Sequence, residues 1–572
     1  MRQVRQILPL VACVLACASG AVESPALADD LARQKMKTNV PAAPDGYRRP
    51  KDWRPDRYTK SLQQIADETS SEQARRAKDE MARVEGINAG GRWKADLESL
   101  ARHACPAWFE DAKIGVFIDW NLYSVASYAR EKSDAAIYPD WYCDFMHFDP
   151  GESKDAHLAA NGIRSYHEAN WGMDFKRDDF IPLFTGRGFD ADRLCCFLKD
   201  CGARYFVPFL KHHDGFCLWD SSWTRRTSVQ RGPKRDFASE MAAACEAHGL
   251  KFGFYFSTGE WEYPFLDDDG SIEIRPGGLG TGAPWPKDES EFETRISGKV
   301  AVRDYKREYV IPQAIEFIDR YDPDLIWFDG EWDSVWTTLG SAEIAAYFYN
   351  RAEGRKEVAV NDRFGLRRAL PAKHTRQEMF SNLLRCHCGD FYTDESGDVA
   401  DQLDPTRHHA WEECTGISKC YGNHWNESEA NVMSEREFLE KFTGIVARGG
   451  NLLLLVNLDA EGRIPKTEAL RLRQIGAWLK RNGEAIYGTR ICAPYSTPAV
   501  DYTRSKDGKT VYAIVKRPAR KIVLECALPA DVSVAFVDGD RPLPTRKIPS
   551  GVCVSLPAEY AANDLPFALR CE

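Results

Sequence analysis

The sequence predicts an α/β protein in which a (β/α) TIM-like barrel is followed by a small C-terminal antiparallel β-sandwich. Short apolar runs alternate with helical stretches from about residue 102 to residue 488, and polar or ionisable residues follow the apolar runs, as at the mouth of a barrel. Beyond Thr489, β-prone runs are separated by Gly, Pro and Asp at short spacing, which is typical of a sandwich. A doubly wound open sheet would alternate similarly, but no Gly-rich phosphate loop follows the first strand.

We expect four segments in the chain: a signal peptide (1–28), a linker with a helical part (29–101), the barrel (102–488) and the sandwich (489–572). Arg2 and Arg5 precede a short apolar run, and small residues ending at Ala28 suit a cleavage site. The protein is therefore expected to be exported, either to the periplasm or into the medium. Lipoprotein processing at Cys17 is the alternative, and no apolar run is long enough to span a membrane.

The expected barrel strands are apolar runs bounded by turn-forming residues. Each is short, and most end on a residue that can make hydrogen bonds. They are Ile114–Ile118 before Asp119, Tyr205–Leu210, Lys251–Ser257, Leu325–Asp329, Glu357–Val360, Gly416–Ser418 and Asn451–Asn457.

Helix signals lie between and after these runs. Asp190–Cys201 ends at a glycine, as does Phe237–His248, and Ser434 begins a capping box for a helix that runs to Arg448. Lys466–Asn482 is the last expected helix. The Gly/Pro/acidic insertion at Asp267–Pro286 is expected to form a surface loop.

Composition excludes some classes of partner and cofactor. The net charge of −10 argues against nucleic acid, which requires a basic surface. Of 17 cysteines, two lie in the expected signal peptide, so the mature chain has an odd number and at least one free thiol. The spacings of Cys386-His387-Cys388 and of Cys414 and Cys420 fit no usual zinc finger, so we expect no metal there.

Asp329 is the central candidate for chemistry. It ends an apolar run, an ionised Asp is rarely buried without a partner, and Gly330 allows the chain to turn away and leave the carboxylate accessible. Other polar and aromatic side chains fall at expected strand ends or in the loops after them: Asp119, Trp141, His212, His213, Tyr255, Trp327 and Arg363. A pocket with carboxylates and aromatic walls suits glycoside hydrolysis, although spacing alone does not select the pair of carboxylates.

The motifs of the chain resemble those of the retaining alpha-L-fucosidases of glycoside hydrolase family twenty-nine, from about Pro106 to Arg490. In order they are PAWFEDAKIGVFIDWNLYS (106–124), DWY (140–142), GARYFVPFLKHHDGFCLWDS (202–221), GFYFSTGEW (253–261), LIWFDGEW (325–332), VNDRFG (360–365), GDFYTDE (389–395), WEECTGIS (411–418), GGNLLLLVN (449–457) and NGEAIYGTR (482–490). The resemblance implies a catalytic barrel, a C-terminal sandwich, a fucosylated glycan as substrate and no metal cofactor.

The resemblance also implies roles for individual residues. Asp329 matches the nucleophile and Trp327 the ring before it; His212 and His213 match histidines that contact sugar hydroxyls, Tyr255 an aromatic residue near the anomeric centre, and Arg363 the arginine after the nucleophile strand. Glu395 matches the acid/base, with Asp394, Glu412 and Glu413 as rivals because the length of that loop varies in the family.

The chain departs from the family pattern at two positions. Asp119 stands where the family usually has His, and Asp140, beside Trp141, stands where it usually has Glu. Both positions are expected to face sugar hydroxyls away from the anomeric carbon, so they concern which sugar binds. A sugar-binding protein without turnover, or a hydrolase of a related or substituted sugar, is the alternative function.

Overall fold

A computed structural model describes residues 40–54, 58–129, 138–147, 162–277, 294–330, 339–363, 389–395, 410–418, 420–427, 429–529, 531–539 and 541–572. The expected signal peptide and Cys17 lie outside these residues, as do Cys386, His387 and Cys388. For Glu395 only the backbone is described. Within the described part of the chain, no helix has the length and apolar character needed to cross a bilayer.

Eight strands form one sheet in the order β7-β6-β3-β2-β1-β10-β9-β8, and every neighbouring pair is parallel. A parallel bridge between Asn361 and Phe391 links the β7 and β8 edges, and Asp390 N donates to Val360 O at 2.8 Å. The sheet is therefore curled into the expected TIM-like barrel. Its strands are β1 (Ile114–Asp119), β2 (Tyr205–Lys211), β3 (Lys251–Ser257), β6 (Leu325–Asp329), β7 (Ala359–Val360), β8 (Tyr392–Glu395), β9 (Trp411–Gly416) and β10 (Asn451–Asn457).

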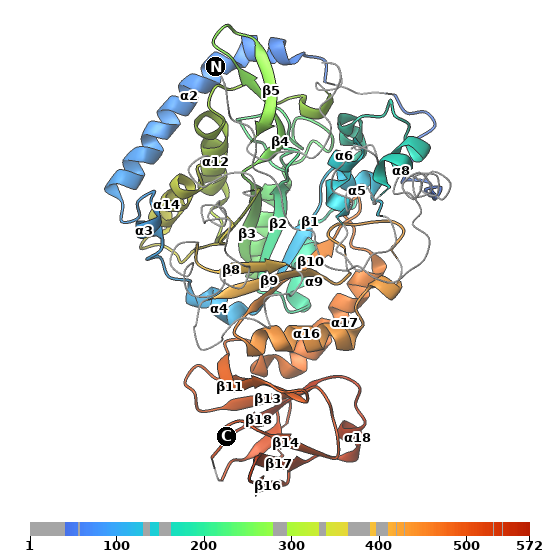
Figure 1. Ribbon diagram of the computed structural model, residues 1–572, viewed down its shortest axis with the longest axis vertical. Coiled ribbons are helices and arrows are strands. Elements are labelled where there is room, and N and C mark those ends of the chain that lie inside the picture. Colours follow the sequence, from blue (N-terminus) through green and yellow to red (C-terminus); the bar gives the residue numbers. More distant parts are fainter. Residues whose placement is uncertain are drawn as a thin grey trace, which may run out of the picture.

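Helices surround the barrel, and the long helix α2 (Leu62–Gly90) lies along its outside against α12 and α14 (Figure 1). The larger helices are α9 (Ala191–Asp200), α10 (Phe237–His248), α12 (Ile311–Tyr321), α14 (Ser341–Ala352), α16 (Glu435–Ala447) and α17 (Lys466–Asn482). Shorter ones are α3 (Leu97–Leu100), α4 (Ala107–Ala112), α5 (Tyr123–Ala126), α6 (Tyr142–Phe145), α8 (Ile163–Asn170), α18 (Ala558–Ala561), η1 (Pro139–Trp141), η2 (Arg177–Leu183), η3 (Lys306–Val310), η4 (Glu429–Asn431) and η5 (Gly483–Ala485).

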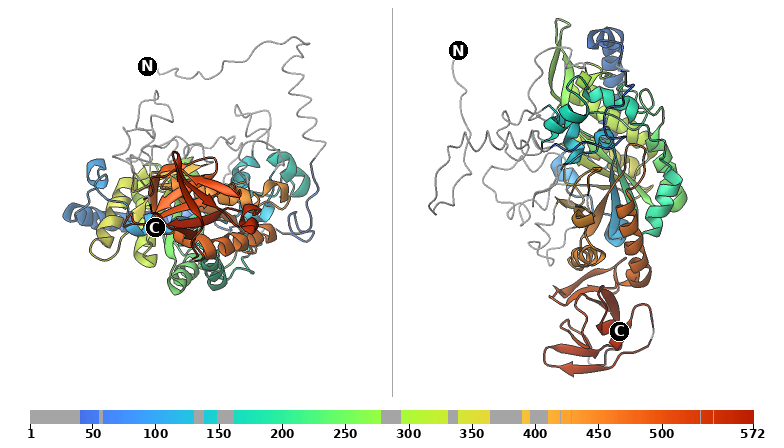
Figure 2. Two further views of the ribbon diagram at one scale, coloured as in Figure 1. Left: turned by 90° about the horizontal axis from the view of Figure 1, so that it is seen from below. Right: turned by 90° about the vertical axis from the view of Figure 1, so that its right-hand side faces the viewer.

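The C-terminal residues form two antiparallel sheets around their own apolar core. These sheets lie below the barrel in Figure 1 and in the right-hand view of Figure 2. One sheet contains β11 (Arg490–Ser496), β12 (Val500–Arg504), β13 (Val511–Val515), β18 (Phe567–Cys571) and β15 (Val534–Phe536); the other contains β14 (Lys521–Leu524), β17 (Gly551–Ser555) and β16 (Thr545–Ile548). Helices α16 and α17 join this sandwich to the barrel: Trp478 Nε1 donates to Pro566 O at 2.6 Å, and Thr443 Oγ1 to Asp501 Oδ2 at 2.7 Å.

Three local expectations are wrong. A strand was expected at 416–418, but β9 ends at Gly416. Its two adjacent glutamates fit in a buried strand because Glu412 hydrogen-bonds inside the barrel and Glu413 pairs with Lys441 outside it. β7 is shorter than expected. The insertion at 267–286 is not all loop, since β5 (Ile272–Gly277) pairs with β4 (Glu260–Leu266) in a hairpin.

Candidate active site

Asp329 ends β6, and two donors fix its carboxylate. Tyr255 OH, from β3, donates to Oδ2 at 2.6 Å, and Arg363 Nη2 lies 3.0 Å from Oδ1. Gly330 follows with φ +86°, and a Cβ there would lie 2.9 Å from Gly259 N, so only glycine suits this turn. Asp329 is thus held at the carboxyl end of its strand, as the sequence predicts.

Trp327 lies two residues before Asp329 on the same strand, β6. Its ring is buried in the barrel interior beside Tyr255, and the Arg363 guanidinium lies 5.1 Å from the ring centroid. Its Nε1 donates to Glu412 Oε1 at 3.0 Å. Trp327 therefore links the nucleophile candidate to the packed centre of the barrel.

His213 lies on the other side of Asp329, with Nε2 3.9 Å from Asp329 Oδ2. Its Nδ1 is 2.6 Å from Ser257 Oγ, and the Ser257 hydroxyl donates to Gly259 O. Because a hydroxyl has one proton, His213 Nδ1 must donate to Ser257 and Nε2 must be an acceptor. Burial lowers the pKa of His213 to about 3, so the ring is neutral.

His212 connects the site to Asp140, since its Nε2 lies 3.6 Å from Asp140 Oδ2. Burial, and then the neighbouring His213, lower the pKa of His212 well below its usual value. Trp141 packs against His213, with ring centroids 5.3 Å apart. The two histidines thus stay uncharged and present polar atoms beside an aromatic wall.

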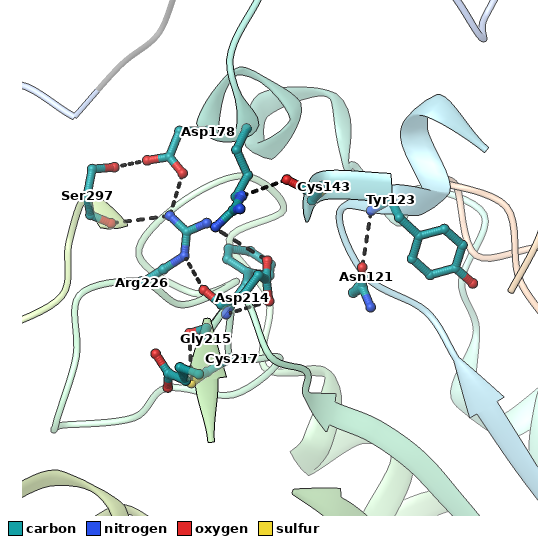
Figure 3. A network of polar contacts seen from close by, with 12 residues as sticks. Asn121, Tyr123, Cys143, Asp178, Asp214, Gly215, Cys217, Arg226 and Ser297 are labelled. Atoms are coloured by element: carbon teal, nitrogen blue, oxygen red, sulfur yellow. Dashed lines mark hydrogen bonds and ion pairs between the residues drawn. The ribbon is translucent and has the colours of Figure 1, made fainter. Parts of the chain in front are cut away.

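The turn after His213 is held by a buried arginine. Arg226 Nε donates to Asp214 O at 3.2 Å, and Arg226 Nη1 donates to Asp178 Oδ1 at 2.5 Å (Figure 3). Sequence inspection did not single out this network, nor Ser257 and Trp261, which contact the histidines. Ser257 and Trp261 both lie in the motif GFYFSTGEW (253–261), and this motif is the feature of the sequence that could have identified them.

Asp119 ends β1, is 1% exposed, and accepts from Asn121 Nδ2 at 3.2 Å through Oδ1. Its Oδ2 is buried and has no hydrogen-bond partner among the described residues. Burial, and then the carboxylate of Asp214, raise the pKa of Asp119 well above its usual value. The protonated form of Asp119 is therefore favoured. A protonated carboxyl group can donate a hydrogen bond, whereas an ionised one can only accept.

The structure separates the rivals for the acid/base role. Glu412 lies deep in the barrel, where it accepts from Tyr205 OH at 2.5 Å and from Trp327, and burial raises its pKa to about 8. Glu413 is on the opposite face of β9, 2.5 Å from Lys441 Nζ, and Asp394 pairs with Glu413 in register and so shares that face. The contacts described for Glu412 and Glu413 are therefore with Tyr205, Trp327 and Lys441 rather than with Asp329.

Glu395 ends β8, and its side chain lies outside the described residues. Its strand is attached to the site region through Thr393, whose N and Oγ1 both donate to Asp362 Oδ1, at 3.0 and 2.7 Å. Its role as acid/base, and a carboxyl separation of roughly 5 to 5.5 Å from Asp329, stay predictions.

The chain is similar to known proteins over most of its length. A family model described as alpha-L-fucosidase matches residues 81–484. The plasma alpha-L-fucosidase of Rattus norvegicus is 31% identical over 80% of this chain and 89% of its own, and the human plasma enzyme is 30% identical over 74% and 78%.

Solved structures agree with this similarity. The alpha-fucosidase of Thermotoga maritima in complex with fucose superposes with a TM-score of 0.65 and 27% identity, covering 84% of this chain and all of that one. A Bacteroides thetaiotaomicron alpha-L-fucosidase, 21% identical with a TM-score of 0.59 over 82% of this chain and 94% of its own, shares the fold. On the extent of the family match and of these relatives, the chain belongs to the alpha-L-fucosidase family.

Proposed function

We propose that this protein is an exported, exo-acting retaining glycosidase that releases α-L-fucose from glycans by a double displacement. Asp329 supports this proposal, because it is a carboxylate at the mouth of the barrel that Tyr255 and Arg363 orient beside neutral histidines. Asp329 is largely buried, with 7% of its surface exposed, and its two donors hold the carboxylate in place.

In the first step, an Asp329 oxygen bonds to the anomeric carbon while the bond from that carbon to the leaving oxygen breaks, and Glu395 gives its proton to that oxygen. In the second step, Glu395 takes a proton from water as the water oxygen replaces Asp329 at the anomeric carbon. Two inversions leave the α configuration of the sugar unchanged.

The neighbouring side chains suit the sugar hydroxyls. His213 Nε2 can accept a hydrogen bond from a sugar hydroxyl, and Asp140 and His212 place further polar atoms nearby. Trp141, packed against His213, offers an apolar ring face. These contacts come from different strand ends, so the sugar would be bound from several sides at once.

Incubation with an aryl α-L-fucoside tests the proposal. We expect aglycone release, with α-L-fucose as the first product anomer in an NMR time course. A panel of other aryl glycosides tests the choice of sugar. Binding of fucose without any aglycone release would instead support a non-catalytic sugar-binding protein.

Asp119 is proposed to bind a sugar hydroxyl through Oδ2, which is buried and accepts no hydrogen bond from the described part of the chain. Asp119→Asn keeps both a donor and an acceptor, so we expect kcat/KM for an unsubstituted fucoside to stay within about threefold of the wild type. Asp119→His should raise the ratio of kcat/KM for a sulfated fucoside to that for the unsubstituted one, because an imidazole can donate to a sulfate oxygen, whereas the acceptor oxygen of the Asp119 carboxyl group repels it. Both ratios are measured with aryl substrates.

Asp192→Asn is the control for this pair, since Asp192 is a surface residue paired with His248. An unchanged substrate ratio in Asp119→His, on every sugar of the panel, would show that Asp119 does not face the ligand.

A further inference from the structure

Cys420, His424 and Glu427 lie together in the loop after β9, and one possible ligand atom of each lies within 4.8 Å of the others. Cys420 and His424 are 1% and 4% exposed. Spacing along the chain pairs Cys420 with Cys414, but Cys414 faces the barrel interior, packed with Trp327 and Tyr255. The group formed by Cys420, His424 and Glu427 is therefore visible only in the folded chain.

The hydrogen bonds around His424 determine which of its ring nitrogens donates. Asn426 Nδ2 donates to Ala129 O at 2.6 Å, so the oxygen of the Asn426 amide is the atom 3.2 Å from His424 Nδ1. His424 Nδ1 must then carry a proton and donate it to that oxygen. In the neutral ring, the lone pair on Nε2 therefore points away from Asn426.

This lone pair faces an acidic oxygen. His424 Nε2 lies 3.4 Å from Glu427 Oε1, and both atoms are buried without a hydrogen-bond partner among the described residues. Two buried acceptors at this distance repel each other unless a proton or a cation lies between them. The contact therefore identifies a position for a positive species.

The surroundings add negative charge. The carboxyl groups of Glu427 and Asp140 lie close enough to the Cys420 thiol to act on it electrostatically. A cation bound to Cys420 would offset this charge and stabilise the thiolate, as metal sites do.

We propose that Cys420, His424 and Glu427 bind one divalent transition-metal ion of the zinc type, with a fourth position for water. Thiolate, imidazole and carboxylate together favour Zn²⁺ over Mg²⁺ or Ca²⁺, which prefer oxygen ligands alone. Bond lengths of about 2.0 to 2.3 Å place the ligand atoms of a tetrahedral site roughly 3 to 4 Å apart. Shifts of the ligand atoms by about 1 Å, through side-chain rotation, would bring them to this separation.

The loop carrying these residues is anchored around them. Asn423 N donates to Tyr123 OH at 3.0 Å, and Tyr123 OH donates to Asp119 O at 2.9 Å. A Cβ at Gly422 would lie 3.0 Å from Asp140 N, so the loop packs directly behind Asp140. The ion would thus hold in place the loop that packs against Tyr123 and Asp140, and so help to fix the positions of Asp119 and Asp140. This role is structural, and the metal would take no part in the reaction.

The test uses the full-length protein, freed of metal with a chelator and titrated with Co²⁺. We expect one equivalent to bind, with a thiolate-to-cobalt absorption band in the near ultraviolet that Zn²⁺ abolishes by displacement. X-ray absorption of the zinc-loaded protein should show one sulfur at about 2.3 Å with nitrogen and oxygen neighbours. This measurement needs no variant, and a zinc shell without sulfur would overturn the proposal.

Variants then locate the site. Cys420→Ser should lose the near-ultraviolet band, and His424→Ala and Glu427→Gln should weaken Co²⁺ binding at least about tenfold. Cys196→Ser removes an exposed thiol and Cys414→Ser a buried one, and both should keep the band. Persistence of the band in Cys420→Ser, or absence of stoichiometric binding to the wild type, would refute the site. Neither readout depends on fucoside hydrolysis, so the site and the proposed function can fail separately.

Discussion

Asp329→Gly is expected to reduce turnover of an aryl α-L-fucoside by about four orders of magnitude or more, since it removes the carboxylate that we propose forms the covalent intermediate. The fold should persist, because the Asp329 side chain lies at the mouth of the barrel and not in its apolar core. Steady-state kinetics and circular dichroism check both parts.

Added azide should restore part of the activity of Asp329→Gly. The small anion fits the space left by the carboxylate, where the Arg363 guanidinium and Tyr255 OH lose their partner. It would attack directly, so NMR should show a fucosyl azide of inverted configuration. Asp324→Asn, at the opposite end of β6, is the matched control and should remain active. Unchanged turnover in Asp329→Gly would remove Asp329 from its role.

Glu395→Ala is expected to slow hydrolysis of an unactivated fucosyl disaccharide by about two to four orders of magnitude, and that of a nitrophenyl fucoside far less. The disaccharide has a poor leaving group that needs a proton, whereas nitrophenolate leaves without one. The ratio of the two kcat/KM values is the measurement.

Three variants serve as controls for Glu395. Asp394→Asn and Glu413→Gln change carboxylates on the outer face of the sheet and should show no dependence on the leaving group. Glu412→Gln keeps the shape of a group buried between Tyr205 and Trp327 and should behave likewise. A dependence on the leaving group in any of these, with none in Glu395→Ala, would move the acid/base role to that residue.

Much of the barrel could be predicted because buried parallel strands are apolar on both faces. β3, β6 and β10 have the bounds expected from their apolar runs, and α10 ends at the expected Gly249, which adopts φ +64°. β9 was missed because it carries two adjacent glutamates. Each has a partner that is distant in sequence, Trp327 and Lys441, and local pattern has no access to such partners.

Residue pattern alone identifies most of the barrel strands and the polar residues at their ends, because burial on both faces requires an apolar run, and this requirement ends where the strand ends. Protonation and pairing required the folded chain. Asp119 is favoured in its protonated form because burial and Asp214 act on it, and Cys420 meets His424 and Glu427 because their loop folds back against Tyr123 and Asp140. Desolvation and close charges act through space, so their effects depend on distances that only tertiary structure supplies.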